Sequence, residues 1–347
     1  MKIALQYSPH NRRDLFEQAG FEVVEDVCET EEDMIRLFSD ADGAQVNTVP
    51  LTSRKVMESC KKLKVVSRMG VGVDSIDLDA ATELGVLACN VPGVNTVEVA
   101  EHAVSMLLLM TRALHEAVLS TKDGGWSRDR LRLLGKSRRI AAHKIGILGF
   151  GNIGRAFASR IRSFGPNKVL AYDPYVNQST ADLYGVELVT LDDMLAKADY
   201  VSIHCSATKE THHIINEVTL SVMKKDSLLV NTARGSCVDG KALAHALKTG
   251  VLAAAALDVT ELEPTDSDDE LLKLPNCYVT PHYAGYSPVF LEECPIRQAE
   301  NIIRVLSGQS APHGLANPEV IKSIAVMRDR GEERWKNIKL FSTALPV

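Results

Sequence analysis

The sequence of 347 residues predicts an α/β fold with two domains, each built on a parallel sheet. Short apolar runs alternate with amphipathic stretches over 1–99, and the alternation restarts at Lys144 after one long helix-like segment. Alternating strands and helices are typical of parallel sheets that helices cover on both faces. The length is also sufficient for two hydrophobic cores.

The first block contains five apolar runs that predict strands and three amphipathic stretches that predict helices between them. The strands are expected at 3–5, 23–24, 43–46, 63–66 and 85–88, and the helices at 12–19, 53–60 and 77–84. A long helix then begins near Asn95, with Glu98 placed as in a capping box. Its apolar positions recur at helical spacing as far as Val118, so we expect it to bridge the two domains.

The second block predicts a second parallel sheet. Its strands are expected at 144–148, 168–172, 200–203, 227–230, 253–257 and 278–280, with a helix at 153–164 that stops at Gly165. A further helix, 291–306, is expected to return to the first block and make that domain discontinuous. The predicted domains are therefore 1–99 with 290–347, and 100–289.

Composition and charge argue against several classes of function. The net charge of −6 gives no basic footprint for nucleic acid. The longest apolar run, 103–110, is far shorter than the roughly 20 residues of a membrane helix, and the N-terminus enters a strand without a signal peptide. Seven cysteines without a CxxC pair predict reduced thiols in a cytoplasm and no metal site.

A glycine fingerprint, Gly149-Phe150-Gly151-Asn152-Ile153-Gly154, lies between a predicted strand and a predicted helix. Such a loop lets the backbone approach a pyrophosphate, which the helix N-terminus stabilises. Asp173 ends the next strand, where it can bind ribose hydroxyls and repel a 2′-phosphate; no Lys or Arg lies between Val169 and Thr180. The pattern predicts NAD rather than NADP, although a purely structural turn is the alternative.

Arg234, Glu263 and His282 each follow an apolar strand-like run, where open α/β sheets bind their ligands. Guanidinium binds a carboxylate through two donors, and imidazole exchanges protons near neutral pH. A carboxylate on the other ring nitrogen fixes the tautomer and favours the charged imidazole. Singly, these residues could be a surface ion pair, a loop acid and a structural histidine. Together they predict hydride transfer between a nicotinamide cofactor and a 2-hydroxy acid.

With these motifs in place, the chain resembles the D-isomer-specific 2-hydroxyacid dehydrogenases from about Asp42 to Pro318. The matching segments are 68–77, 99–102, 149–154, 172–174, 231–235, 258–264 and 280–285. The resemblance implies two Rossmann-like domains: a discontinuous flavodoxin-like substrate domain and a central NAD-binding domain, with catalysis in the cleft. It also implies a homodimer formed largely through the NAD-binding domains.

The resemblance assigns roles to individual residues. Arg234, Glu263 and His282 match the catalytic trio, and Asp258 is expected near the nicotinamide amide. The expected cofactor-binding residues are Gly149, Gly151, Asn152, Ile153, Gly154, Asp173, Cys205, Thr232, Ala233, Asp258 and Gly285. The expected substrate-binding residues are Arg68, Val71, Gly72 and Arg234, while Thr96 is either a cofactor contact or a helix cap.

Two features depart from the family pattern. Ser206 stands where the family usually has proline, which puts the shape of that loop in doubt. The tail, 319–347, has no counterpart in the family; its charges predict a solvated segment, with an added oligomer contact as the alternative.

The substrate remains open at this stage. The main expectation is a D-2-hydroxy acid or 2-oxo acid, with D-3-phosphoglycerate dehydrogenase as the alternative because 68–77 and 172–174 resemble that branch. No arginine precedes 46–52 to meet a phosphate, so unphosphorylated acids are favoured unless Arg68 takes that role. A formate dehydrogenase is disfavoured because that branch lacks the glutamate. An alternative of another class is an NAD-sensing co-regulator.

Overall fold

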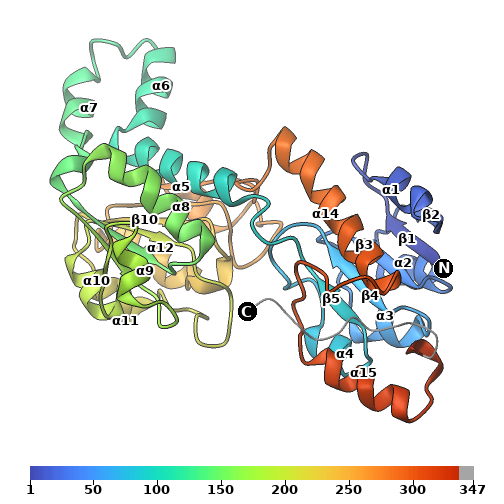
Figure 1. The fold of residues 1–347 in the computed structure, drawn as a ribbon. Coiled ribbons are helices and arrows are strands. Elements are labelled where there is room, and N and C mark those ends of the chain that lie inside the picture. The colour runs from blue at the N-terminus through green and yellow to red at the C-terminus, as the bar shows by residue number, and fades with distance from the viewer. Residues whose placement is uncertain (336–347) are drawn as a thin grey trace. The chain divides into compact units, whose positions relative to one another are not determined.

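The computed structural model describes residues 1–335 and divides the chain into two compact units. One unit comprises Met1–Asn95 and the residues from Ser287 onward, and the other comprises Thr96–Tyr286. Each unit contains one sheet whose paired strands are all parallel, which confirms the predicted α/β class (Figure 1). The unit boundaries lie a few residues before the positions expected from the sequence.

The first unit has a five-stranded sheet in the order β2-β1-β3-β4-β5, the doubly wound order of flavodoxin. Its strands are β1 (Lys2–Gln6), β2 (Glu22–Asp26), β3 (Gly43–Val46), β4 (Val65–Arg68) and β5 (Leu87–Cys89). Its helices are α1 (Arg13–Gln18), α2 (Glu31–Phe38), α3 (Arg54–Ser59), α4 (Leu78–Glu83), α14 (Pro288–Leu306) and α15 (Val320–Asp329), and a 3₁₀ turn, η4, covers Glu333–Trp335.

Helix α14 packs on the sheet of the first unit, against β3 and β4. A Cβ atom on Gly43 would lie 2.9 Å from Ile302 Cγ2, so the absent side chain lets helix and strand approach closely. Gln298, fully buried on the same helix, donates to the carbonyl oxygens of Val46 and Ser67. The late helix and the early strands therefore share one core.

The described part of the tail packs on the first unit through a few apolar residues. Val320 and Ile324 of α15 are fully buried. The Trp335 side chain is also fully buried, and its Nε1 donates to Gly85 O at 2.8 Å. The prediction of a solvated segment is therefore wrong for these apolar residues, which face the first core, whereas the charged residues 328–330 and 332 are exposed as expected. The rest of the tail lies outside the described residues.

The second unit has a seven-stranded sheet in the order β12-β11-β10-β9-β6-β7-β8. Its strands are β6 (Lys144–Leu148), β7 (Lys168–Tyr172), β8 (Glu187–Leu188), β9 (Tyr200–Ile203), β10 (Leu228–Asn231), β11 (Ala254–Leu257) and β12 (Cys277–Val279). Because β6 lies between β7 and β9, the strand order reverses at β6. Open α/β sheets bind their ligands at the carboxyl ends of the strands beside such a switch point.

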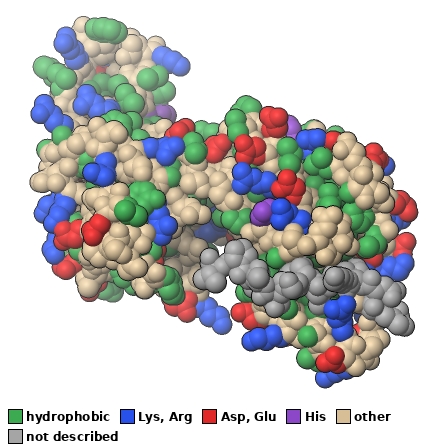
Figure 2. Space-filling model, in the orientation of Figure 1, with side chains coloured by type: hydrophobic (Ala, Val, Ile, Leu, Met, Phe, Trp, Pro, Cys, Tyr) green, Lys and Arg blue, Asp and Glu red, His purple; other side chains and the backbone are tan. Residues whose placement is uncertain are grey.

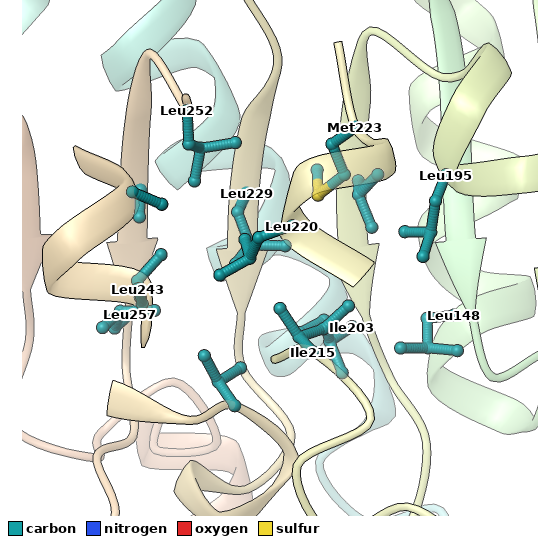
Figure 3. Close-up of a cluster of buried hydrophobic side chains, with 14 of the residues drawn as sticks. Leu148, Leu195, Ile203, Ile215, Leu220, Met223, Leu229, Leu243, Leu252 and Leu257 are labelled. Atoms are coloured by element: carbon teal, nitrogen blue, oxygen red, sulfur yellow. The ribbon is translucent and has the colours of Figure 1, made fainter. Parts of the chain in front are cut away.

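Helices cover both faces of this second sheet. They are α5 (Thr96–Thr111), α6 (Leu114–Lys122), α7 (Arg130–Lys136), α8 (Asn152–Ile161), α9 (Gln178–Asp182), α10 (Leu191–Lys197), α11 (Glu217–Val222), α12 (Gly240–Thr249) and α13 (Glu270–Lys273), with 3₁₀ turns η1 (Ile140–Ala142), η2 (Arg162–Phe164) and η3 (Gly235–Cys237). On one face, Leu148, Ile203 and Leu229 of the strands meet the apolar sides of α10, α11 and α12 (Figure 3). On the other, α5 and α8 bury their apolar sides.

The predicted single long helix is wrong, because it breaks after Thr111. Ala113 has a left-handed backbone (φ 49°), and the axes of α5 and α6 differ by 61°. Of residues 1–335, no single helix is long and apolar enough to cross a membrane, although α5 and α6 meet the same criteria as a bent pair. Helix α5 buries Ala100, Ala103 and Leu107 in the second unit.

Candidate active site

The glycine fingerprint begins directly after β6 with Gly149, whose φ of 91° suits glycine. A Cβ atom on Gly149 would lie 2.5 Å from Cys205 N, and one on Gly154 would lie 2.2 Å from Gly149 O. Both positions therefore require glycine for close packing. The loop is fixed between the end of β9 and the first turn of α8.

Gly151 differs from these two glycines because a Cβ atom there would meet nothing within 4 Å. It is the N-cap residue of α8, and no side chain caps the N-terminal N–H groups of that helix. Gly151 and Asn152 are exposed, and Ile153 is half-buried. Open space beside uncapped helix N–H groups suits a pyrophosphate.

Asp173 lies directly after β7, beside the fingerprint. Its Oδ2 accepts a hydrogen bond from Phe150 N at 2.7 Å, and its Oδ1 accepts one from Tyr175 N at 2.9 Å. These bonds fix the carboxylate, while each oxygen keeps a lone pair for a ribose hydroxyl. The residues present therefore suit the ribose of NAD.

Thr232 follows β10, and its buried hydroxyl is available to bind a ligand. The residue is 7% exposed, and its Oγ1 has no hydrogen-bond partner among the described residues. Buried hydroxyls normally have a partner, which a cofactor could supply. Ala233 N donates to Asn231 Oδ1 at 3.0 Å, so the backbone beside Thr232 is already fixed.

The same asparagine also positions Arg234. Asn231 Nδ2 donates to Arg234 O at 2.9 Å, and Arg234 Nη1 donates to Ala233 O at 2.6 Å. A Cβ atom on Gly235 would lie 1.9 Å from Thr260 O, so the turn with Arg234 is pressed against the loop after β11.

His282 and Glu263 form the predicted acid–base pair. Their Nδ1 and Oε2 atoms are 2.5 Å apart, and Glu263 Oε1 accepts from Thr260 N at 3.1 Å. The side chains are 44% and 36% exposed. With Nδ1 directed at the carboxylate, Nε2 is the ring nitrogen that can exchange a proton with a substrate.

Asp258 is 1% exposed and organises the loop that carries His282. Its Oδ1 accepts from Thr280 Oγ1 at 2.6 Å and Tyr283 N at 3.1 Å, and its Oδ2 accepts from Ala284 N at 2.9 Å. The prediction gave Asp258 to the cofactor; the structure shows in addition that it holds the backbone beside His282. Gly285 continues this loop.

His102 of α5 supports the same network and was not among the predicted site residues. Its Nε2 lies 3.2 Å from Thr280 Oγ1 and 3.7 Å from Asp258 Oδ1, and its ring meets the Tyr283 ring edge-on at 5.0 Å. Burial lowers the pKa of His102, although Asp258 opposes that shift. The only sequence signal was its place in the segment 99–102, because a contact with the loop after β12 cannot be seen from spacing.

The predicted substrate-binding residues other than Arg234 lie in the first unit. Arg68, the last residue of β4, is 5% exposed, and its Nε donates to Ser75 Oγ at 3.1 Å. Val71 and Gly72 are half-buried in the loop after that strand, and Val71 O accepts from Asn90 Nδ2 at 2.5 Å. The structure thus groups the trio in the second unit and these three residues in the first.

Threonine hydroxyls shape the loop in which Ser206 replaces the usual proline. Thr211 Oγ1 donates to Ser206 O at 2.6 Å and accepts from Thr208 N at 2.8 Å. The loop from 206 to 211 is therefore held by side-chain bonds.

Comparison with known proteins identifies the family. The model for the NAD binding domain of D-isomer specific 2-hydroxyacid dehydrogenases matches residues 104–284, more than half of the chain. The chain belongs to the D-isomer specific 2-hydroxyacid dehydrogenases. It therefore carries the NAD-binding domain of that family, and the structure places the glycine fingerprint and Asp173 within it.

Curated relatives of this chain include two archaeal D-3-phosphoglycerate dehydrogenases. The one from Methanocaldococcus jannaschii is 37% identical over 292 residues, which cover 84% of this chain and 55% of the relative. The one from Archaeoglobus fulgidus is 36% identical over 310 residues, covering 88% and 57%. The chain thus spans about half the length of the curated relatives it matches.

Solved structures share the fold over nearly the whole chain. The TT0316 protein from Thermus thermophilus matches with a TM-score of 0.82 and 31% identity, covering 91% of this chain and 100% of that one. The holo D-mandelate dehydrogenase of Rhodotorula graminis matches with a TM-score of 0.83 and 26% identity, covering 91% and 97%. D-lactate dehydrogenase with NAD⁺ from Lactobacillus jensenii gives a TM-score of 0.73 and 28% identity, covering 91% and 99%.

Proposed function

We propose that this chain is an NAD-dependent oxidoreductase that interconverts a D-2-hydroxy acid and the corresponding 2-oxo acid. The observation that carries the proposal is the His282–Glu263 pair, 2.5 Å apart, in the same unit as Arg234 and the glycine fingerprint. Family membership supports this reading, because these positions match the catalytic trio. When bound, NAD supplies the hydride acceptor at C4 of its nicotinamide.

Side chains of this protein would bind the substrate, transfer the proton and hold the cofactor. Arg234 binds the substrate carboxylate through its planar guanidinium and polarises the adjacent carbonyl. His282 Nε2 gives a proton to the carbonyl oxygen during reduction and takes it back during oxidation. Glu263 orients the imidazole and stabilises its charged form. The N-terminal N–H groups of α8, Asp173 and Thr232 would hold the cofactor.

A spectrophotometric screen of 2-oxo acids with NADH tests this proposal. Pyruvate, glyoxylate, hydroxypyruvate and 3-phosphohydroxypyruvate span the expected substrates, and His282→Ala is the matched control. We expect oxidation of NADH with at least one acid and its near loss in the variant. Tight NADH binding without turnover of any acid would instead favour an NAD-sensing co-regulator.

D-3-phosphoglycerate dehydrogenase is the second candidate, because the curated relatives bear that name. The first unit argues against it. The segment 46–52 contains no Lys or Arg, and the Arg68 side chain is 5% exposed. A phosphate needs charge-assisted donors. We therefore propose an unphosphorylated substrate, bound in part by the backbone of Val71 and Gly72.

A homodimer is supported by the surface of α6 and α7. Helix α6 buries no residue, and both helices project from the rest of the second unit (Figure 1). Hydrophobic and basic side chains gather over them (Figure 2). The exposed apolar residues of this surface are Leu114, Val118, Leu119, Trp126, Leu131 and Leu134. Contiguous exposed apolar surface marks a protein interface.

The dimer is tested by light scattering after gel filtration. Leu131→Glu should convert dimer to monomer because it puts a charge into the apolar surface. Leu183→Glu is the matched control: both leucines are 81% exposed, but Leu183 lies outside α6 and α7. If Leu131→Glu and Leu183→Glu were both monomeric, or both dimeric, the proposed interface would be refuted.

We also propose a cytoplasmic location, in contact with the small-molecule substrate and with neither membrane nor nucleic acid. All seven cysteines are free in the structure, as reducing compartments allow. Fractionation of cells expressing the tagged protein tests the location.

A further inference from the structure

Two of the free cysteines form a close pair beside the candidate cofactor site. Cys205 lies just after β9, and Cys237 is the last residue of η3. Their Sγ atoms are 3.8 Å apart. Cys205 is half-buried, whereas Cys237 is fully buried. An oxidant can therefore approach the pair through Cys205.

Each cysteine is attached to a different part of the candidate site. The backbone of Cys205 lies against Gly149, where a Cβ atom would be 2.5 Å from Cys205 N and 2.6 Å from its Cα. Cys237 N donates to Arg234 O at 3.2 Å. A shift of the Cys205 sulfur should therefore displace the glycine fingerprint, and a shift of the Cys237 sulfur should displace the turn that carries Arg234.

The environment of the pair favours a shared thiolate. The pKa of the Cys237 thiol is lowered, first because Cys205 donates a hydrogen bond to it and further by the backbone and the charge of Arg234. The hydrogen bond to Cys237, together with burial, raises the pKa of the Cys205 thiol. Burial opposes the shift of Cys237, and the proton of Cys205 lies in the hydrogen bond between the two sulfurs. Thiolate is the reactive form of cysteine.

We propose that Cys205 and Cys237 are a modification site at which hydrogen peroxide forms a reversible disulfide. Cys237 holds the thiolate but is buried, so the reaction requires transfer of the shared proton from Cys205 to Cys237, which places the thiolate on the half-buried sulfur. Cys205 then attacks a peroxide oxygen; the O–O bond breaks, hydroxide leaves, and Cys205 becomes a sulfenic acid. The Cys237 sulfur then attacks the Cys205 sulfur, forming the S–S bond and releasing water. The two sulfurs lose two electrons in total, and the peroxide gains them.

The disulfide deforms the candidate site. An S–S bond is about 2.05 Å long, so the sulfurs must approach by roughly 1.8 Å. The turn at Gly235 cannot absorb this shift freely, because it is pressed against Thr260 O. A misplacement of about 1 Å can lower turnover by about 10²-fold. This consequence rests on the proposed function, whereas the disulfide itself does not.

Peptide mapping of the full-length protein tests the disulfide directly. After treatment with peroxide and alkylation of the remaining thiols, trypsin releases 198–209 and 235–241, which contain one cysteine each. We expect these peptides to be cross-linked and to separate after dithiothreitol. Saturating NADH should slow the cross-link, since Cys205 is an expected cofactor contact. Absence of the cross-linked peptides would overturn the proposal.

Two variants connect the disulfide to function. Cys237→Ala removes one partner, and Cys277→Ala removes a buried cysteine of the same unit outside the pair. Relative to its own untreated rate, Cys277→Ala should lose about 10²-fold in kcat/KM with peroxide, as the wild type does, while Cys237→Ala should not. Equal sensitivity of the two variants would refute the link. If no 2-oxo acid is turned over, NADH fluorescence titration gives the same comparison, so failure of the proposed function remains distinguishable.

Discussion

Asp258 and His282 are joined by contacts that fix the backbone of the loop after β12. His282 N donates to Asp258 O at 2.8 Å, and the Asp258 carboxylate accepts the N–H groups of the next two residues, Tyr283 and Ala284. His282 has a left-handed backbone (φ 48°), which is uncommon outside glycine and needs such support. The place of the imidazole therefore depends on a buried carboxylate.

Removal of the imidazole should nearly abolish turnover. His282→Ala should lower kcat by about 10²–10⁴-fold, the usual contribution of a positioned acid or base. Glu263→Gln should have a smaller effect, because the amide still bonds Nδ1 but no longer stabilises the charged ring. NADH affinity, measured by fluorescence, should change little in both variants. Near-full activity of His282→Ala would end the mechanistic proposal.

Cofactor choice should depend on Asp173. Like charges about 4 Å apart near a protein surface repel by about 1–4 kcal/mol. We therefore expect kcat/KM for NADH to exceed that for NADPH by about tenfold or more, and Asp173→Ala to narrow the difference. Wild-type protein that uses both cofactors equally would show that Asp173 does not face the ribose.

His102 should act as a positioning residue for the loop of His282. His102→Ala removes one of the two partners of Thr280 Oγ1, at 3.2 Å, and leaves the bond to Asp258; the loosened loop should lower kcat by up to about 10²-fold. KM for NADH should change much less, and His102→Gln should restore part of kcat because its amide can bond the threonine. His245→Ala is the control, since His245 is exposed. Equal kcat in both alanine variants would contradict the assignment.

Unphosphorylated acids should outcompete 3-phosphohydroxypyruvate at fixed NADH. The nearest cations beyond 46–52 are engaged elsewhere: Arg54 pairs with Glu83 at 2.7 Å and Lys55 with Glu32 at 2.5 Å. An unpaired phosphate in a closed site costs several kcal/mol, on the order expected for buried ions. A higher kcat/KM for the phosphorylated acid, lost in Arg68→Ala, would place the protein with the phosphoglycerate dehydrogenases.

His204 should make the fold sensitive to acid. Its ring lies 5.0 Å from that of Phe157, and burial lowers its pKa to about 3. Between about pH 6.5 and pH 3 the unfolded chain binds a proton that the folded chain excludes. This group's stabilising contribution is therefore present above pH 6.5 and declines by up to about 1.4 kcal/mol per pH unit below it. Urea unfolding from pH 7 to 5 should show a smaller loss in His204→Gln; identical losses would refute the prediction.

Local chemistry made the fingerprint and the sheets predictable. Gly149 and Gly154 are dictated by close backbone contacts whose spacing is fixed within one turn, and apolar runs such as 144–148 match β6. Long-range packing could not be predicted. The break at Ala113 leaves no signal in the residue spacing, the burial of Trp335 depends on a contact with distant Gly85, and the two-residue strand β8 is too short to give a pattern. The trio was expected, whereas its support by His102 was not.

Because Gly235 has no side chain, the turn 231–235, which carries Arg234, packs directly against the loop after β11. With Thr260 O only 1.9 Å from where a Cβ would stand, neither segment can move without displacing the other. Substitutions in 231–235 and 258–263 should therefore combine non-additively. Attempts to redesign substrate choice must vary both segments together, because neither can be tuned as an independent module.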